Sequence, residues 1–327
     1  MFIIITVGIL LFTALFLLVL RFALPNFRFA WPAATGGALL AWISVFFWQS
    51  GMPALLQIPL WQPDDVFRQS PLFIADGISW AFSLSIVTIC LAVIITSVAR
   101  ENFPGPLGWV GVSALTALGV LAVTADNPLT LVLLWAAIDL TEIVSQMRFV
   151  EDPRLSERAV ISFASRVTGI LILLWASMVS ASDGSVLDFL SPAPRAGLYL
   201  IIAAAFRLGV LPLHLPYASE SSFRRGFGTA LRMISAGSSL ILLARIPLGG
   251  IESPLTPYLM MFVSFAALYG AWMWLRSPDE LTGRPYWLIG LGALAVASAL
   301  RGNSLGATAW SCALILSGGA LFLASAE

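Results

Sequence analysis

The sequence has few of the residues from which disulfide-linked folds and metal sites are built. Its 327 residues include one histidine, His214, and two cysteines, and charged residues make up only 10% of the chain. Cys90 and Cys312 lie far apart within apolar runs, with no CxxC or histidine spacing near them. We therefore expect two small buried side chains, and neither a disulfide nor a metal site.

Lysine is absent, since all 17 basic residues are arginine. The sequence also lacks the usual marks of an enzyme: it has no glycine-rich phosphate loop, no nucleophile–base set and no hydrophilic stretch long enough for a soluble domain. We expect no catalytic residue, no cofactor, no bound metal and no nucleic-acid partner.

Apolar sequence is what the chain has in abundance. Hydrophobic residues make up 59% of it, the mean hydropathy is +0.93, and apolar runs of about 20 residues recur along its length. Only helices and closed barrels satisfy the backbone within lipid, and the alternating segments of a barrel are missing. The first run, residues 2–23, has no basic start and no small-residue cleavage site, which favours a retained helix over a signal peptide. The composition predicts an all-α polytopic membrane protein.

Windows of about 20 apolar residues predict eleven membrane spans. They are expected at residues 2–23, 29–50, 72–99, 107–125, 128–147, 158–181, 196–216, 226–246, 255–275, 285–300 and 305–325. Loops after odd-numbered spans, counted with the adjoining span ends, carry ten arginines, whereas those after even-numbered spans carry four. Because the arginine-rich side stays cytoplasmic, we expect a bacterial-type inner-membrane protein with its amino terminus outside and its carboxyl terminus in the cytoplasm.

Ionisable residues inside spans are costly in lipid and are therefore functional candidates. The fifth span holds Asp139 and Glu142, which are three residues apart and so share one helical face. Two carboxyl groups on one face can pass protons if burial raises the pKa of one of them toward neutrality. Alternatively, both lie near the cytoplasmic end of the span and pair with Arg148 or Arg158. The sequence favours neither interpretation.

Three arginines also lie within predicted spans. Arg166 is about two turns inside the sixth, and we expect it to face the bundle and pair with Asp139 or Glu142 rather than reach for the interface. Arg232 is about one turn inside the eighth, where we expect its side chain to extend to the interface. Arg207 lies near the middle of the seventh span, too deep for its side chain to extend to the interface.

The seventh span continues from Arg207 into "LGVLPLHLP", in which prolines flank the histidine. Pro212 removes a backbone donor and is expected to free a carbonyl near residue 208. A helix broken at this depth is tolerated where it is buried in protein or lines a water-filled cavity. The simpler expectation is a kink, with Arg207 bound to a carboxylate of the fifth span and His214 hydrogen-bonded to backbone.

Several segments match, in order, the motifs of one protein family. They are "FIADGISWAFSLSIVTIC" before and within the third span, "ADNPLTLVLLWAAIDL" at the fifth, "SFASRVTGILILLW" with "DGSVLDF" at the sixth, "FRLGVLPLHLPYASE" at the seventh and "MISAGSSLILLAR" at the eighth. Further weak matches are "DELTGRPYWLIGLGALAVASAL" and "WSCALILSGGALFLASAE". Together they resemble the antiporter-like subunits of respiratory complex I, Mrp-type cation/proton antiporters, membrane-bound hydrogenases and certain inorganic-carbon uptake complexes.

The resemblance implies two inverted five-helix repeats, each with a broken helix. It divides the chain into an N-terminal three-helix segment (1–106), a first repeat (107–246) and a truncated second repeat (247–327). The broken seventh helix would span 196–216, with Pro212 and Pro216 at the break. Because the sequence stops at Glu327, we expect the twelfth helix and the rest of the second repeat to be missing.

The family's proton relay uses a glutamate on the fifth helix and lysines or histidines on the seventh, eighth and later helices. Here the corresponding positions hold Ala136, Arg207, Thr229 and Gly318 or Gly319. Burial can make a lysine release its proton near neutral pH, whereas arginine stays protonated in proteins. The resemblance therefore implies a retained architecture without the usual lysine relay.

Two functions remain open at this stage. The first is a degenerate antiporter-like subunit that scaffolds a multisubunit complex, docked against other membrane subunits, a larger soluble or peripheral subunit and lipids. The second is an active proton or cation translocating subunit with a path through Asp139, Glu142, Arg166, Arg207 and His214. It would be coupled to a redox complex of the NADH/quinone or hydrogenase type, or to an inorganic-carbon uptake complex.

Overall fold

A computed structural model describes residues 2–24, 29–58, 70–99, 106–149, 153–189, 192, 194–215, 225–247 and 253–324. Within these ranges, eleven α-helices follow one another in the order predicted from the apolar runs. They are α1 (Phe2–Ala23), α2 (Ala30–Phe46), α3 (Gly77–Thr96), α4 (Pro106–Thr124), α5 (Pro128–Phe149), α6 (Pro153–Ser182), α7 (Pro194–Arg207), α8 (Arg225–Ala244), α9 (Thr256–Arg276), α10 (Glu280–Leu300) and α11 (Ser304–Ala324).

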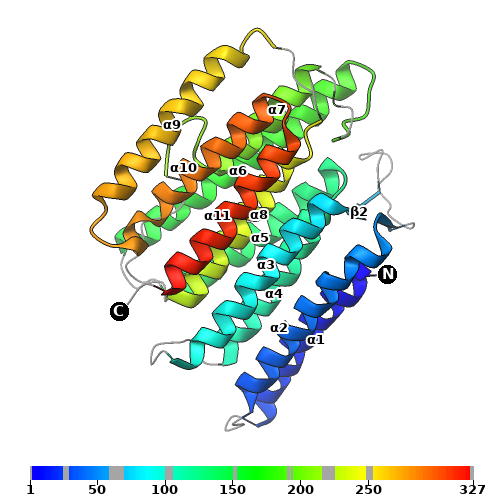
Figure 1. Cartoon of the computed structure of the whole chain (residues 1–327), viewed down its shortest axis with the longest axis vertical. Coiled ribbons are helices and arrows are strands. Elements are labelled where there is room, and N and C mark those ends of the chain that lie inside the picture. Colours follow the sequence, from blue (N-terminus) through cyan, green and yellow to red (C-terminus); the bar gives the residue numbers. More distant parts are fainter. Residues whose placement is uncertain are drawn as a thin grey trace.

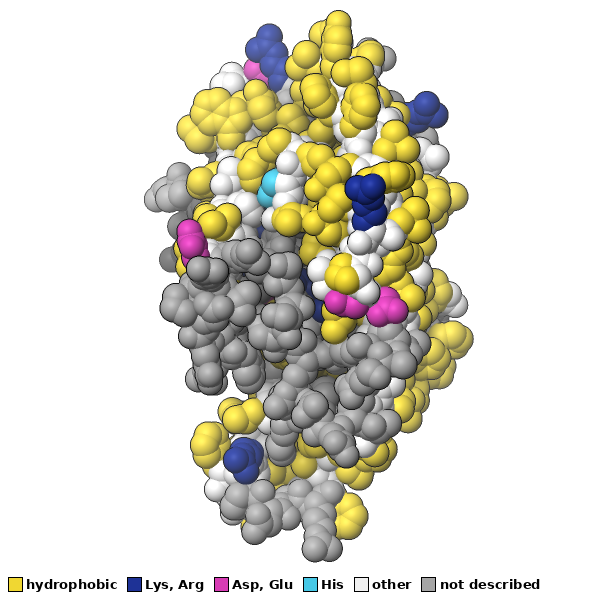
Figure 2. Space-filling view, turned by 90° about the vertical axis from the view of Figure 1, so that its left-hand side faces the viewer, with side chains coloured by type: hydrophobic (Ala, Val, Ile, Leu, Met, Phe, Trp, Pro, Cys, Tyr) yellow, Lys and Arg dark blue, Asp and Glu magenta, His cyan; other side chains and the backbone are white. Residues whose placement is uncertain are grey.

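The helices have the dimensions of membrane spans. Among the described residues, eight are long and apolar enough to cross a bilayer. The other three are α7, which has 14 residues, α5, whose last side chains lie outside the described part of the chain, and α10, whose first turns carry Glu280 and Arg284. On the face shown in Figure 2, hydrophobic side chains cover most of the described surface and charged ones are scattered. The prediction of an all-α polytopic membrane protein is confirmed.

The helices run side by side, with α1 and α2 at one edge of the molecule and α9 at the other (Figure 1). Helix α8 lies at the centre, where it packs against α3, α4, α7 and α11, and its side chains from 226 to 244 are buried. Small residues permit this close approach. A Cβ atom added at Gly237, for example, would lie 3.2 Å from Ile315 and 3.3 Å from Ile86.

One end of the bundle carries a small β-hairpin that the sequence did not predict. Strand β1 (Ala54–Gln57) pairs antiparallel with β2 (Leu72–Ala75), and Phe73 of β2 forms a bridge with Ala125. The third span was expected from residue 72, but its helix begins at Gly77. Asp76 caps that helix, because its carboxylate accepts a hydrogen bond from the backbone N–H of Ser79 at 2.8 Å.

Helix α7 ends earlier than predicted, and glycine rather than proline ends it. The backbone N–H groups of Gly209 and Val210 donate to the carbonyls of Phe206 and Ala205, and Gly209 has a φ of +73°. This is a Schellman motif, which favours glycine at the left-handed position. Pro212 therefore follows the helix instead of interrupting it, and the expected kink is wrong. Pro216 lies outside the described residues.

Candidate functional site

The interior of the bundle holds five ionisable side chains that form one ion-pair cluster: Asp139, Glu142, Arg166, Arg207 and Arg232. Their exposed fractions are between 0% and 1%. Four helices contribute to it, because α5 supplies both carboxylates and α6, α7 and α8 supply one arginine each. The two carboxylates lie one turn apart on the face of α5 that points into the bundle.

Arg207, the last residue of α7, holds Asp139 in a two-pronged contact. Its Nη1 and Nη2 atoms donate to Oδ2 and Oδ1 of the carboxylate at 2.6 and 2.9 Å. The Nε–H donates to the Ser239 hydroxyl at 3.0 Å, and Nη1 also donates to the Arg166 carbonyl at 3.0 Å. The guanidinium lies 4.3 Å from the ring centroid of Trp135. A planar guanidinium with all three nitrogens engaged has its orientation fixed.

Arg166 joins the two carboxylates of α5. Its Nε lies 3.3 Å from Asp139 Oδ1, and its Nη1 lies 2.5 Å from Glu142 Oε1. Both the pairing of Arg166 within the bundle and the pairing of Arg207 with the fifth span are confirmed. The alternative partners of the carboxylates, Arg148 and Arg158, have side chains outside the described part of the structure.

The expectation for Arg232 was wrong. Its side chain is 1% exposed, and its Nη1 lies 2.5 Å from Glu142 Oε1 instead of extending to the interface. The physical reason is that α8 is enclosed by other helices along its length, so its side chains lie in the protein interior, where Glu142 offers an opposite charge. Glu142 therefore binds two guanidinium groups through the same oxygen.

Gly169 was missed by the sequence analysis, although it makes room for Arg207. It lies on α6, and a Cβ atom added there would overlap Cγ of Arg207, lie 3.0 Å from its Cδ and lie 3.2 Å from the Ala203 carbonyl oxygen. Trp135 and Ser239 were missed as well. An isolated helical glycine, a tryptophan and a serine are common in membrane helices, and only the fold brings these three to the arginine.

We predict that Gly169→Ala lowers the free energy of unfolding, by the roughly 1–3 kcal/mol typical of overpacked cores. The added methyl group would displace the stem of Arg207 and loosen its contact with Asp139. Detergent-solubilised protein unfolded by heat would report the change. Gly8→Ala on α1 is the control, because a Cβ atom there has no neighbour within 4 Å. A Gly169 variant as stable as the control would show that α6 does not hold the arginine in place.

His214 lies apart from the ion-pair cluster, in the turn after α7. Its Nδ1 is 2.8 Å from the Pro212 carbonyl, and its ring centroid is 4.9 Å from that of Phe206. Because a carbonyl only accepts, Nδ1 carries the hydrogen of this bond. The expected hydrogen bond to backbone is confirmed. Within the described residues, none of the ion pairs of the cluster includes His214.

Gly318, Gly319 and Thr229 stand where the family that this sequence resembles has further relay residues. All three are small, and apolar side chains pack closely around the two glycines. A Cβ atom added at Gly319 would overlap Ile89, and one at Gly318 would lie 3.0 Å from Trp287 Nε1 and 3.2 Å from the Met233 sulfur. A lysine at either glycine would require its neighbours to move. Thr229 is buried on α8.

A second group of charges, the Arg245 cluster, lies at the end of the bundle that carries the hairpin. Arg245 Nη1 lies 3.3 Å from Asp76 Oδ2 and 3.5 Å from Asp126 Oδ1. The negative charge of Asp188 also influences the Asp126 carboxyl. Burial raises the pKa of the Asp126 carboxyl, and the charges of Asp188 and Asp76 raise it further, while Arg245 opposes them. The cluster ties together the connections before α3 and α5 and the end of α8.

The raised pKa of Asp126 predicts a pH dependence of stability. The folded protein holds this proton more tightly than the unfolded chain, so the stabilisation is fully present below the ordinary aspartate pKa of about 3.9 and is lost as the pH rises through the folded-state pKa. Asp126→Asn removes this dependence. Melting temperatures in detergent should therefore fall, between pH 4 and pH 7, more for the wild type than for Asp126→Asn.

The exposed Asp183 provides the control for this experiment, as Asp183→Asn. That variant should keep the pH dependence of the wild type. If Asp126→Asn also keeps it, the pH dependence does not come from Asp126. Among the described residues, no group of three or more histidine, cysteine, aspartate or glutamate side chains is placed to bind a metal ion.

Comparison with known proteins gives a likeness of fold. No family model matches the sequence, and a search of curated proteins gives no match. A chain of respiratory complex I from Thermus thermophilus, solved with bound NADH, matches with a TM-score of 0.80 and 17% identity, over 99% of this chain and 70% of that chain.

Two other assemblies contain chains of similar structure. A chain of the Mrp complex from Dietzia sp. matches with a TM-score of 0.75 and 17% identity, over 98% of this chain and 37% of that one. A chain of the membrane-bound sulfane sulfur reductase, an archaeal respiratory membrane complex, matches with a TM-score of 0.75 and 14% identity, over 97% and 55%. The chain therefore has the fold of the antiporter-like membrane subunits of complex I and Mrp assemblies.

Proposed function

We propose that this chain is an integral subunit of a multisubunit membrane complex, in which it holds neighbouring subunits in place and does not relay protons. The observation that carries the proposal is the contact between Arg207 and Asp139, in which two nitrogens of a buried guanidinium bind both oxygens of a carboxylate. This arrangement supports a structural role for the position at which the resembling family has a lysine.

The chemistry of the pair supports the same conclusion. A relay group must bind and release a proton, and arginine does not release one in proteins. Asp139 is held by two guanidinium groups, those of Arg207 and Arg166. Its negative charge therefore serves as a counter-charge to two buried cations in a low-dielectric interior, where removing one partner of an ion pair is costly.

A second candidate function is active proton or cation translocation along a different path. The ion pairs form a continuous series across α7, α5, α6 and α8, from Arg207 through Asp139, Arg166 and Glu142 to Arg232. Such a series favours a role in ion movement, and His214, which lies apart from it in the turn after α7, would be a further group on the path. The chain would then be coupled to a redox complex of the NADH/quinone or hydrogenase type, or to an inorganic-carbon uptake complex.

The placement of the chain in its membrane is part of the proposal. Its partners would be other membrane subunits, a larger soluble or peripheral subunit and lipids, in a bacterial-type inner membrane with the amino terminus outside. The start of α1 and the end of α11 lie at opposite ends of the bundle (Figure 1), which supports an odd number of crossings. The division into an N-terminal segment, a first repeat and part of a second also remains a proposal.

The two functions predict different behaviour of single variants. The complex would be purified through a tag on this chain, and its assembly and its proton flux in liposomes would be measured for Asp139→Asn, Arg207→Ala and His214→Ala. The scaffold proposal expects the first two variants to lower the yield of assembled complex while the flux per assembled complex stays unchanged. Normal assembly with abolished flux would overturn the proposal in favour of translocation.

A further inference from the structure

An open apolar groove lies between α9 and α10, away from both charge clusters. It has a volume of about 450 Å³ and is lined by Ala267, Leu268, Gly270, Ala271, Trp274 and Leu275 of α9, and by Tyr286, Trp287, Gly290, Leu291 and Leu294 of α10. Leu268 and Leu275 are 68% and 80% exposed. The groove therefore lies on the outer surface of the bundle, at the level of the membrane.

The floor of the groove is formed where the two helices touch. A Cβ atom added at Gly270 would lie 2.6 Å from the backbone nitrogen of Gly290 and 2.8 Å from its Cα. This contact brings the helices together backbone to backbone. Gly290 has no side chain, and Ala267 and Ala271 have only methyl groups. The space between the helices above this contact is therefore left open as a channel.

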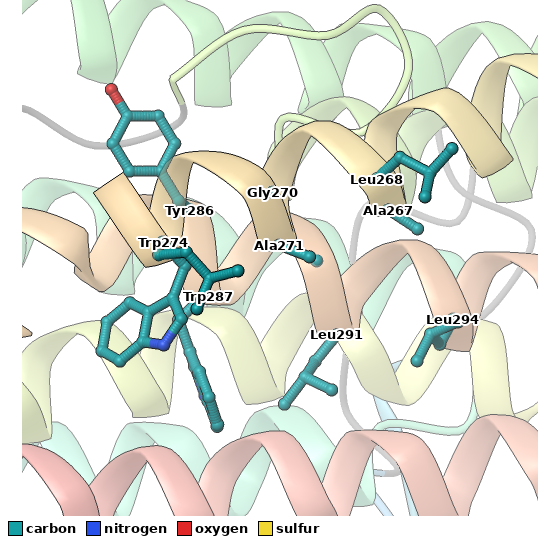
Figure 3. Close-up of a pocket in the computed structure, with 11 residues that line it drawn as sticks. Ala267, Leu268, Gly270, Ala271, Trp274, Tyr286, Trp287, Leu291 and Leu294 are labelled. Atoms are coloured by element: carbon teal, nitrogen blue, oxygen red, sulfur yellow. The ribbon is translucent and has the colours of Figure 1, made fainter. Parts of the chain in front are cut away.

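The groove is asymmetric along its length. Trp274, Tyr286 and Trp287 lie at one end, toward the α9–α10 connection, and Ala267, Leu268 and Leu294 lie at the other (Figure 3). Tryptophan and tyrosine favour the membrane interface, and aliphatic side chains favour the hydrocarbon. The aromatic end therefore faces the headgroup region, and the groove runs from there toward the middle of the membrane.

Its length matches one leaflet. From residue 267 to residue 275 an α-helix rises about 12 Å, which is close to half of the hydrocarbon thickness of about 30 Å. A transmembrane helix of a partner is about 10–12 Å in diameter and would cross both leaflets. The dimensions therefore favour a single hydrocarbon chain over a helix.

Polar groups suitable for a headgroup are present at the aromatic end. The Tyr286 hydroxyl makes no hydrogen bond within the described part of the chain. Arg276 is exposed at the end of α9, and its guanidinium lies 4.7 Å from the ring centroid of Trp272. The nearby Asp279 carboxylate is already engaged, because it caps α10 by accepting hydrogen bonds from Thr282.

We propose that this groove binds one acyl chain of a phospholipid, whose phosphate lies at the α9–α10 connection near Arg276. The chain would fill the channel above Gly270 and Gly290. The Tyr286 hydroxyl would donate to an ester or phosphate oxygen, and Arg276 would favour an anionic headgroup. The proposal is independent of whether the subunit moves ions.

Native mass spectrometry of the purified full-length chain tests the proposal, with palmitoyl-oleoyl phosphatidylglycerol or phosphatidylcholine added to the detergent. The wild type should retain one phospholipid, with phosphatidylglycerol retained severalfold more than phosphatidylcholine. The Ala271→Phe variant, in which the added ring fills the groove, should lose most of the bound phospholipid. The control is Ala164→Phe at an exposed site on α6, which should retain the lipid as the wild type does.

A second pair of variants tests the headgroup. Arg276→Gln should abolish the preference for phosphatidylglycerol, while Arg301→Gln, the same change at the other end of α10, should not. Equal retention by Ala271→Phe and the wild type would overturn the acyl-chain site. If that variant instead lowers assembly of the complex without changing lipid retention, the groove holds a partner subunit and the proposal is wrong. An unchanged preference in Arg276→Gln would overturn the placement of the phosphate.

Discussion

Replacing Glu142 by glutamine is expected to lower the free energy of unfolding by about 3–5 kcal/mol, as when one partner of a buried ion pair is removed. Glu142 Oε1 lies 2.5 Å from nitrogens of both Arg166 and Arg232. The amide has nearly the shape of the carboxylate, so no cavity forms, but its negative charge is gone. Two buried guanidinium groups would then repel each other with less compensation.

The loss would be measured by unfolding the detergent-solubilised chain with heat or denaturant, with retention of helix content checked before unfolding. Glu157→Gln is the matched control, because Glu157 is an exposed residue of α6 and should change stability by less than about 0.5 kcal/mol. If Glu142→Gln behaves like this control, the negative charge of Glu142 is not what holds α5, α6 and α8 together.

The second large effect is expected at Arg207. Arg207→Ala removes the forked contact with Asp139 and the hydrogen bond to Ser239, and it should cost about 3–5 kcal/mol. Arg207→Lys should cost less, because it keeps the positive charge, but it cannot reproduce the planar fork. The order of stability should therefore be wild type, then lysine, then alanine.

Arg301→Ala is the control for this series, since Arg301 is exposed at the end of α10. Each protein would be assayed by the same unfolding transition in one detergent. A lysine variant as stable as the wild type would mean that charge alone matters at this position. A lysine variant no more stable than alanine would mean that the geometry of the guanidinium provides the whole effect.

Much of the fold could be predicted from the sequence because the hydrocarbon core of a membrane restricts which segments can cross it. A helix must be apolar for about 20 residues to cross it, so the order of the spans is readable as a series of runs. The same rule indicated the partners of Arg207 and Arg166, because a buried charge in a span requires an opposite one.

The predictions that failed, for Arg232 and for the end of α7, and the missed role of Gly169 depend on details of the folded structure that the apolar runs do not indicate. Arg232 lies one turn from a loop in the sequence, but α8 is enclosed by its neighbours, so the side chain turns to Glu142. Gly209 ends α7 through a left-handed conformation, whereas the sequence predicted a break further along the chain, at Pro212 and Pro216. The role of Gly169 depends on a side chain of another helix, which no local pattern indicates.

The central claim is that the pair of Asp139 and Arg207 is structural. Replacing a buried ion pair by apolar residues of similar volume is often tolerated, so Asp139→Leu combined with Arg207→Met should recover assembly that either single change loses. The decisive measurement is the proton flux per assembled complex in liposomes under an imposed membrane potential. We predict the same flux for the double variant and the wild type. An assembled double variant that has lost the flux of the wild type would contradict the account.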